Sequence, residues 1–243
     1  LSQTTFWRDG HYQKALFPET SFGESPKQDF TSGGVKTGAV YKLNGRNYIT
    51  ANAAFLTNAP TARSAYLSPR TREAIISDLT TEKDLSGDIS YEVRMPRVKG
   101  RATLYYVNTS DGVWSRSFYH DVYQTYVNYS MTGVGELHEG AELAAEVKLS
   151  PTWDATAVFA DGQYLYNSRP TATVTRDNSD TALATGRTVY WKNYRVGGMP
   201  QKAASFGLRY TAPKYWSIGA NVNWFGDIYL DPNADRRTAE AVE

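Results

Sequence analysis

The segment APKYWSIGANVNWFGDIYLD, Ala212–Asp231, alternates apolar and polar residues from Trp216 to Trp224. Successive side chains of a β-strand point to opposite faces, so the alternation predicts a strand. One face would carry Trp216, Ile218, Ala220, Val222 and Trp224. The other would carry Ser217, Gly219, Asn221 and Asn223. This run is longer than the usual ~5–6 residues of a strand, which raises the question of whether its apolar face meets a protein core or lipid.

Composition restricts the function classes. The 243 residues include 26 Lys and Arg against 25 Asp and Glu, with no long basic run, so charge predicts no nucleic-acid partner. Cysteine is absent, which excludes disulfides, thiolate metal sites and a cysteine nucleophile. No stretch approaches the ~20 apolar residues of a membrane helix, whereas transmembrane strands need only ~9–11 residues and remain allowed.

Strand patterns recur along the chain. The clearest lie at residues 35–43, 89–95, 140–149 and 204–211, and others at 99–108 and 125–133. Helix patterns are weak, and only a short helical turn is expected around Arg72–Asp78. With an incomplete strand at TTFWRD, residues 4–9, about nine strands are expected in total. Residues 1–243 are therefore interpreted as one segment of an all-β, antiparallel, up-and-down meander.

Short and long connections alternate between these strands. The tight ones are LNGR, with an Asn-Gly turn, then MPRVK, LSPTWD and TAPKYW. Long polar connections are expected at residues 58–85, 110–122 and 167–201. Alternate connections of a meander lie at the same end of the sheet, so one end would carry only tight turns. This asymmetry is typical of outer-membrane barrels, which have short periplasmic turns and long external loops.

The sequence therefore favours part of a transmembrane β-barrel, in contact with outer-membrane lipid. Tyr and Trp near the strand ends would form the aromatic girdles at the two interfaces. The predicted residues are Trp153, Tyr164, Tyr215, Trp216, Trp224 and Tyr229. The alternative is a soluble secreted β-sheet module that binds a ligand or carbohydrate, in which the apolar faces would pack on a second protein layer.

Several segments resemble TonB-dependent outer-membrane receptors. LTTEKDLSGDISYEV, residues 79–93, is similar to the Asn-Leu-Lys-Pro-Glu segment that precedes a barrel strand in that family, with Thr81 where the family usually has Pro. HEGAELAAEVKLSPTWDATAVFA, residues 138–160, resembles the family's Gly-Val-Glu-Leu strand and the strand after it. Residues 41–60 and 204–232 look like the later strands of Bacteroidetes-type receptors.

The resemblance implies a location in the outer membrane of a Gram-negative cell and a role in energised import. Receptors of this family hold a plug domain inside a barrel of about 22 strands and bind the TonB protein through an N-terminal box. This chain shows neither part, so it is expected to be a piece of the C-terminal half of the barrel. Its expected partners are a scarce nutrient (a siderophore, cobalamin, a glycan or a peptide), the plug domain of the native chain, TonB and lipid.

Two groups of candidate site residues follow. Aromatic and basic residues in the expected external loops are candidates for ligand binding, because aromatic rings with polar tips give large contact areas. They are Trp114, Arg116, Tyr119, Tyr123, Arg187, Tyr190, Trp191 and Tyr194. Charged residues on the polar strand faces are expected to line the lumen, paired with one another or with the plug. They are Arg94, Arg101, Glu142, Glu146, Lys148 and Arg209.

Signals for catalysis are weak. The three histidines, His11, His120 and His138, lack the spacing of zinc ligands. No nucleophile motif, phosphate-binding loop or acid and base pair stands out. The sequence therefore predicts no enzyme activity, no metal site and no cofactor.

Overall fold

The computed structural model describes residues 1–11, 21–68, 73–177, 179 and 181–242. Strands dominate the described chain, and its helices are short. None of the described helices has the length and hydropathy needed to cross a membrane. In chain order the elements are β1 (Ser2–Phe6), β2 (Asp9–Gly10), β3 (Gly23–Glu24), β4 (Gln28–Ser32), β5 (Gly34–Lys42), β6 (Asn47–Asn58), α1 (Ala62–Ala65), β7 (Glu82–Arg94), β8 (Val98–His120), β9 (Thr125–Lys148), β10 (Trp153–Tyr166), β11 (Thr171–Arg176), β12 (Ala182–Thr188), β13 (Pro200–Thr211), β14 (Ser217–Ile228), η2 (Asp235–Arg237) and α2 (Ala239–Val242).

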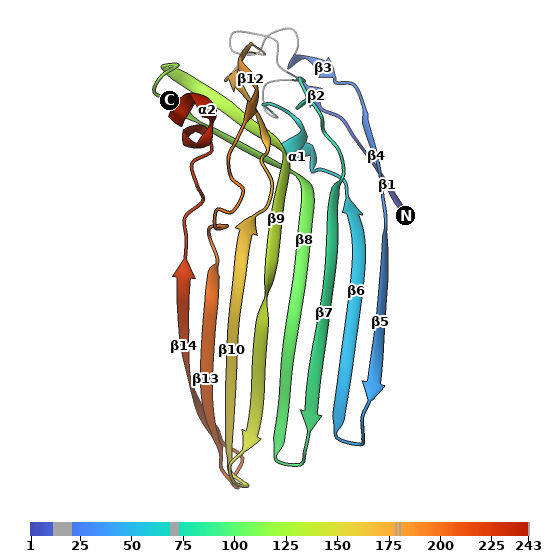
Figure 1. Cartoon of the computed structure of the whole chain (residues 1–243), viewed down its shortest axis with the longest axis vertical. Helices are drawn as coiled ribbons and strands as arrows, with labels where there is room; N and C mark the ends of the chain where they lie inside the picture. The colour runs from blue at the N-terminus through green and yellow to red at the C-terminus, as the bar shows by residue number, and fades with distance from the viewer. Residues whose placement is uncertain (12–20, 69–72, 178, 180, 243) are drawn as a thin grey trace.

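The main sheet has ten strands in a single layer (Figure 1). Eight of them follow the order β5-β6-β7-β8-β9-β10-β13-β14, and all neighbours are antiparallel. The remaining two, β11 and β12, pair with each other, and β11 also pairs with the upper part of β9. The expected fold class, an all-β antiparallel up-and-down meander, is confirmed. The incomplete strand expected at residues 4–9 is present only in part: β1 ends at Phe6, residues 7–8 are not in a strand, and β1 pairs with β4 in a separate two-stranded sheet outside the meander.

The four tight turns all lie at one end of the sheet, the lower end in Figure 1. Each closes through a backbone hydrogen bond, for example from the Leu43 amide to the Asn47 carbonyl and from the Met95 amide to the Val98 carbonyl. The longer connections, the helices and the described ends of the chain lie toward the other end (Figure 1). The predicted asymmetry between a short-turn end and a long-loop end is therefore confirmed.

The expected loop at residues 110–122 is wrong, because β8 and β9 continue through it as a long hairpin of 23 and 24 residues. The pairing register shifts between Thr109 and Val113, where Asp111 has a φ of 61°. This is a β-bulge, which adds a residue to one strand without ending it. The Ser-Asp-Gly signal at 110–112 marks that bulge. For the same reason the strands expected separately at 125–133 and 140–149 are one strand, β9.

The helical turn expected around Arg72–Asp78 is also absent from residues 73–78, and residue 72 lies outside the described residues. The nearest helix is α1, whose first turn is capped by Thr61. The Thr61 hydroxyl accepts a hydrogen bond from the Ser64 amide at 3.3 Å, which is the bond that favours threonine at this position.

Cross-strand pairing sorts the side chains of the main sheet onto two faces. Paired residues share a face, so Ile218, Tyr210 and Trp153 lie together, and Gly219, Arg209 and Asp154 lie on the opposite side. Followed across the sheet, this rule defines an apolar face and a polar face. The apolar face carries Val35, Tyr41, Ile49, Phe55, Leu85, Ile89, Tyr91, Leu104, Leu143, Trp153, Phe159, Phe206, Ile218, Val222 and Trp224.

Both faces of the sheet are exposed. Val35, Leu104 and Val222, on three well separated strands of the apolar face, are exposed by 71%, 60% and 69%. Within the described residues no second protein layer covers this face (Figure 1). The main hydrophobic core instead lies at the long-loop end. It contains Val127, Tyr129, Met131, Val134, Tyr166, Ala172, Val174, Val189, Trp191, Val196 and Ala234.

A pair of glycines lets two tyrosines lie flat on the polar face. Gly140 of β9 and Gly162 of β10 are directly opposite each other. The hydroxyl groups of Tyr105 and Tyr164 are hydrogen-bonded at 3.0 Å. A Cβ on Gly140 would come within 2.5 Å of the Asp161 carbonyl oxygen and 2.7 Å of the Tyr105 hydroxyl. Residue 140 therefore has no room for a side chain.

We expect Gly140→Ala to destabilise the sheet by about 1–3 kcal/mol, because a methyl group there forces the backbone of β9 and β10 apart. The measurement is the urea midpoint of unfolding, followed by tryptophan fluorescence. Gly87→Ala is the matched control, since a Cβ at residue 87 meets its nearest atom only at 3.4 Å. Equal midpoints for the two variants would contradict this account of the glycine pair.

Candidate functional site

The polar face of the sheet gathers every charged residue that the sequence predicted for the lumen. Arg94, Arg101, Glu142, Glu146, Lys148 and Arg209 all lie on this face in the cross-strand register. They come from β7, β8, β9 and β13. The structure thus brings these side chains onto one surface, whose role as a lumen wall remains a prediction.

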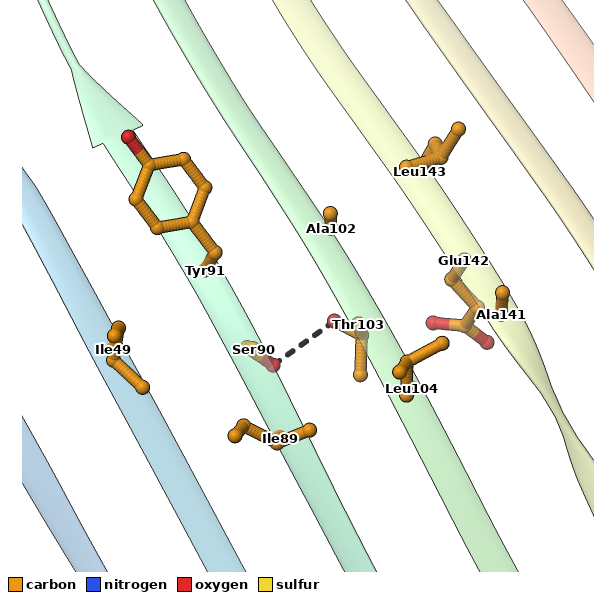
Figure 2. Close-up of a pocket in the computed structure, with 10 residues that line it drawn as sticks. All are labelled: Ile49, Ile89, Ser90, Tyr91, Ala102, Thr103, Leu104, Ala141, Glu142 and Leu143. Atoms are coloured by element: carbon orange, nitrogen blue, oxygen red, sulfur yellow. Dashed lines mark hydrogen bonds between the residues drawn. The ribbon is translucent and has the colours of Figure 1, made fainter.

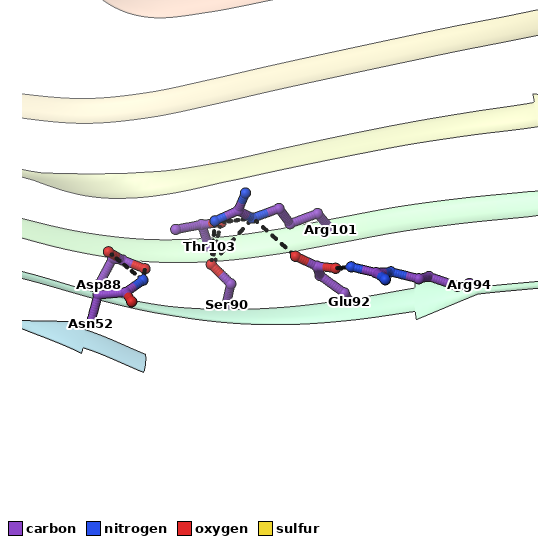
Figure 3. A network of polar contacts seen from close by, with 7 residues as sticks. All are labelled: Asn52, Asp88, Ser90, Glu92, Arg94, Arg101 and Thr103. Atoms are coloured by element: carbon purple, nitrogen blue, oxygen red, sulfur yellow. Dashed lines mark hydrogen bonds and ion pairs between the residues drawn. The ribbon is translucent and has the colours of Figure 1, made fainter. Parts of the chain in front are cut away.

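Arg101 is the centre of a polar network on β7 and β8 (Figure 3). Its guanidinium donates hydrogen bonds to the Ser90 hydroxyl at 3.0 Å and to the Thr103 hydroxyl at 3.2 Å. Glu92 lies 4.0 Å from Arg101 and accepts a 2.6 Å bond from Arg94. Ser90 is nearly fully buried beneath these contacts. The Glu92 carboxylate therefore contacts two guanidinium groups, and the five side chains form one connected polar cluster.

Other charges on the polar face are paired across strands in the same way. The Lys99 ammonium lies 3.4 Å from Glu146, and Arg209 lies 3.1 Å from Asp154. Asn52 donates to Asp88 at 3.0 Å. These pairs are exposed, so each contributes little to stability. Because positive and negative side chains are paired in this way, the polar face is strongly polar but has no large excess of charge of one sign.

The opposite, apolar face has a shallow depression of about 300 Å³ at the middle of β7, β8 and β9 (Figure 2). Ala102 and Ala141 lie between the larger side chains that surround it. Those larger side chains are Ile49, Ile89, Tyr91, Leu104 and Leu143. Ser90, Thr103 and Glu142 complete the lining, and because their side chains belong to the polar face in the strand register, the depression offers mainly apolar contact.

The predicted loop residues divide into a packed group and an exposed group. Trp191 is fully buried, and its ring packs against Tyr166 at a tilt of 37° and makes an edge contact with Trp114. Trp114 and Tyr123 pack against the same core. These three rings therefore support the loop core, and in this arrangement Trp191 presents no surface to a ligand.

Arg187 also acts within the loop core. It donates a 2.9 Å hydrogen bond to the Tyr123 hydroxyl and lies 3.8 Å from both Asp235 and Glu240. Asp235 is further within 3.0 Å of His120. The contacts tie the β8–β9 hairpin and β12 to the C-terminal residues of the chain. The sequence analysis missed Asp235 and Glu240, because nothing in their local pattern marks them as partners of a residue fifty positions away.

Tyr129 lies inside the loop core, out of contact with solvent. Its side chain is fully buried, and burial raises the pKa of its hydroxyl well above the ordinary value, with a further contribution from the negative charge of Asp235. The phenol is therefore neutral at physiological pH. It contributes apolar packing to the core, beside Trp114 and Phe118.

The remaining four candidates reach the surface. Tyr119 is half exposed and packs edge-on against Tyr126 on the hairpin. Arg116 lies over the ring of Trp114. Tyr190 and Tyr194 are partly exposed, and each has an arginine over its ring, Arg169 and Arg237 respectively. These four side chains do not converge on one pocket. They form an aromatic and basic surface at the long-loop end.

Within the described parts of the chain, no three His, Cys, Asp or Glu side chains lie close enough together to hold a metal ion. His138 pairs with Glu136 at 2.9 Å and stacks on Tyr164, and His120 contacts Asp235. Both are thus engaged in contacts with protein groups. His11 is exposed at the edge of the described N-terminal segment.

Comparison with known proteins places the fold. No family model matches the chain, and no curated protein sequence matches it. Among solved structures the chain is similar to the copper transporter OprC, with a TM-score of 0.57 and 16% sequence identity. The match covers 84% of this chain but only 27% of that chain. At this identity the likeness establishes the architecture of the sheet, and activity has to be argued from the residues.

We expect Trp191→Ala to destabilise the loop core by about 3–5 kcal/mol, because it removes the largest fully buried side chain. The effect should be local: amide hydrogen exchange should accelerate in β11 and in residues 125–134 of β9, with protection of β5 to β7 unchanged. Tyr190→Ala, at the neighbouring exposed position, is the control and should leave the exchange pattern intact. Uniform loss of protection in the whole sheet would show that the loop core and the sheet are one cooperative unit.

Proposed function

We propose that this chain forms part of the wall of an outer-membrane β-barrel of the TonB-dependent receptor kind, which imports a scarce nutrient. One observation carries the proposal: a single-layer sheet exposes a continuous apolar face on one side and a hydrogen-bonded polar face on the other. The fold likeness to a transporter and the sequence resemblance described above support the same assignment. The finer assignment to Bacteroidetes-type receptors rests on residues 41–60 and 204–232 alone.

The apolar face indicates which medium surrounds this side of the sheet. Soluble monomers rarely expose apolar patches larger than a few hundred Å², and here such a patch extends over eight strands. In lipid the same face is favourable, provided that every backbone N–H and C=O group is paired. Antiparallel pairing satisfies the backbone of the inner strands. The two edges, β5 and β14, have no second neighbour along the sheet within the described residues, and closure of a barrel would pair them.

The polar face would line the interior of the barrel. Its ion pairs, such as Arg209 with Asp154, leave hydrated groups along the path without a strong charge of one sign. The expected partner on this side is the plug domain of the native chain, which would move when TonB transmits energy to it. The chemistry proposed is therefore binding and transport, without a covalent step.

The nutrient would meet the long-loop end first. The exposed candidates there are Arg116, Tyr119, Tyr190 and Tyr194, which suit a siderophore, cobalamin, a glycan or a peptide. Copper is the substrate in the name of the structural neighbour, and at 16% identity that assignment is not carried over to this chain.

The competing function, a soluble secreted binding module, requires a protein layer over Ile218, Val222 and Leu208. Ile218 and Val222 are exposed and Leu208 is only partly buried, and that observation favours lipid.

Cysteine scanning of β14 tests the proposal, since the chain has no natural cysteine. Single cysteines at Ile218, Ala220 and Val222 should react with a lipid-soluble thiol reagent in native membranes. Cysteines at Gly219, Asn221 and Asn223 should react with a water-soluble reagent. Protection of the first set from both reagents would indicate a protein core, and the transport proposal would then be abandoned for the soluble module.

A charge placed on the apolar face should prevent membrane assembly. We expect Val222→Arg to cost about 2–4 kcal/mol, the penalty for arginine near the middle of a barrel's lipid face. Asn223→Arg is the matched control, since the adjacent residue points to the polar face and should change stability by less than ~1 kcal/mol. The measurement is the folded fraction in vesicles along a urea titration, and similar losses for both variants would argue against a lipid-facing surface.

A further inference from the structure

Three of the four turns at the short-turn end carry a positive charge, and none of the four carries a negative one. Arg46, Arg97 and Lys214 lie within the turns at residues 43–46, 95–97 and 212–216, and Lys148 comes just before the turn at residues 149–152. None of these turns contains Asp or Glu. The long-loop end, in contrast, mixes both signs, as in the contacts of Arg187 with Asp235 and Glu240.

These basic residues differ from the others nearby because no acidic side chain pairs with them. The acids at this end of the strands are Glu92, Glu146 and Asp154, and each already pairs with a basic residue on the polar face. Among the described residues, the side chains of Arg46, Arg97 and Lys214 have no ion pair. Adjacent turns are two strands apart, so Arg46 and Arg97 are ~10 Å apart, and Lys214, two turns further along the sheet, is ~20 Å from Arg97.

A cluster of aromatic residues lies at the Lys214 end of this row of basic residues, on the apolar face. Trp153 and Tyr210 are tilted against each other at 5.0 Å, and Tyr210 contacts Trp216 at 5.3 Å. Trp and Tyr prefer the level of the lipid headgroups, where one part of the ring is apolar and another is hydrated. The turns just beyond the rings would therefore lie among the phosphates.

An apolar groove leads from these turns toward the middle of the sheet. It has a volume of about 460 Å³ and passes Val93, Gly100, Ala145 and Phe159. It shares Tyr91, Ala102 and Leu143 with the depression in Figure 2. At its lower end Gly100 is three residues from Arg97, or ~10 Å along the strand. The groove extends across β7, β8, β9 and β10, and its β7–β8 end lies above the turn that carries Arg97.

We propose that the short-turn end binds anionic phospholipid: the phosphates contact Arg46, Arg97 and Lys214, and an acyl chain lies in the groove above Arg97. This inference rests on the membrane location proposed above and adds a lipid partner of defined charge. Charge complementarity selects the occupant, because each of these unpaired cations attracts a headgroup with a net negative charge and has little preference for a zwitterionic one. Each basic side chain close to an anionic surface strengthens binding by about fivefold.

Quenching of tryptophan fluorescence by brominated lipid tests the proposal. The natural full-length protein is reconstituted into phosphatidylcholine vesicles containing about 10 mol % of either brominated phosphatidylglycerol or brominated phosphatidylcholine. The test variant is R46Q/R97Q/K214Q. The control is R63Q/K192Q/R236Q, which removes the same charge from exposed residues at the long-loop end.

The wild type and the control should be quenched several-fold more by brominated phosphatidylglycerol than by brominated phosphatidylcholine. The test variant should lose this preference, with a fall in relative affinity of about tenfold or more. Trp153→Phe in the wild-type background should remove a large part of the preferential signal, because Trp153 lies at the headgroup level. Sodium chloride at about 0.5 M should weaken the preference by screening.

Three results would overturn the inference. The first is equal quenching of the wild type by both lipids, and the second is a preference that the test variant retains. The third is a preference that inorganic phosphate abolishes while sodium chloride of equal ionic strength does not, which would identify a site for the free ion. Absence of quenching by either lipid would instead contradict the membrane location. The two proposals can therefore fail separately.

Discussion

The pairing register between neighbouring strands is the constraint on which the rest of this structure depends. Side chains alternate with a period of two, so a slip of one residue in any pair would move every apolar side chain of that strand to the polar face. The register of β13 with β14 places Phe206 opposite Val222 and Gly207 opposite Asn221. Repeated across the sheet, the same register separates the apolar face from the ion pairs around Arg101.

Two kinds of stabilisation follow from this arrangement. The single-layer sheet encloses no hydrophobic core of its own. It is held together by backbone hydrogen bonds and by the medium that contacts each face. The long-loop end has an ordinary dry core, centred on Trp191 and Tyr129. Local unfolding of the loops and loss of the sheet are thus expected to be distinct events with different solvent dependence.

The sequence was sufficient for those features that depend on local periodicity. The alternation in residues 216–224 and the compact turns at Asn44–Gly45 and Pro213–Lys214 predicted the strands, their order and the two ends of the sheet. The sequence failed where a local signal had two meanings. Ser110–Gly112 is a bulge and not a loop, because a strand partner far along the chain continues the pairing. Trp191 and Arg187 resembled surface ligand contacts, and only long-range packing against β9 and residues 234–240 gave them a structural role.

The transfer of pairing from β10 to β11 has a consequence for how such a chain can vary. β10 ends at Tyr166 opposite Glu136, and β11 then pairs with β9 from Thr132 to Val127. β9 thus keeps a partner along its upper part although the chain leaves the sheet between the two strands. Within the described residues β12 pairs with β11 alone, so substitutions at its exposed residues, such as Thr185 and Thr188, can change the surface of the long-loop end while the pairing of β9 is kept. If the chain is the receptor wall proposed above, the surface that meets the nutrient can change while the membrane-facing sheet stays the same.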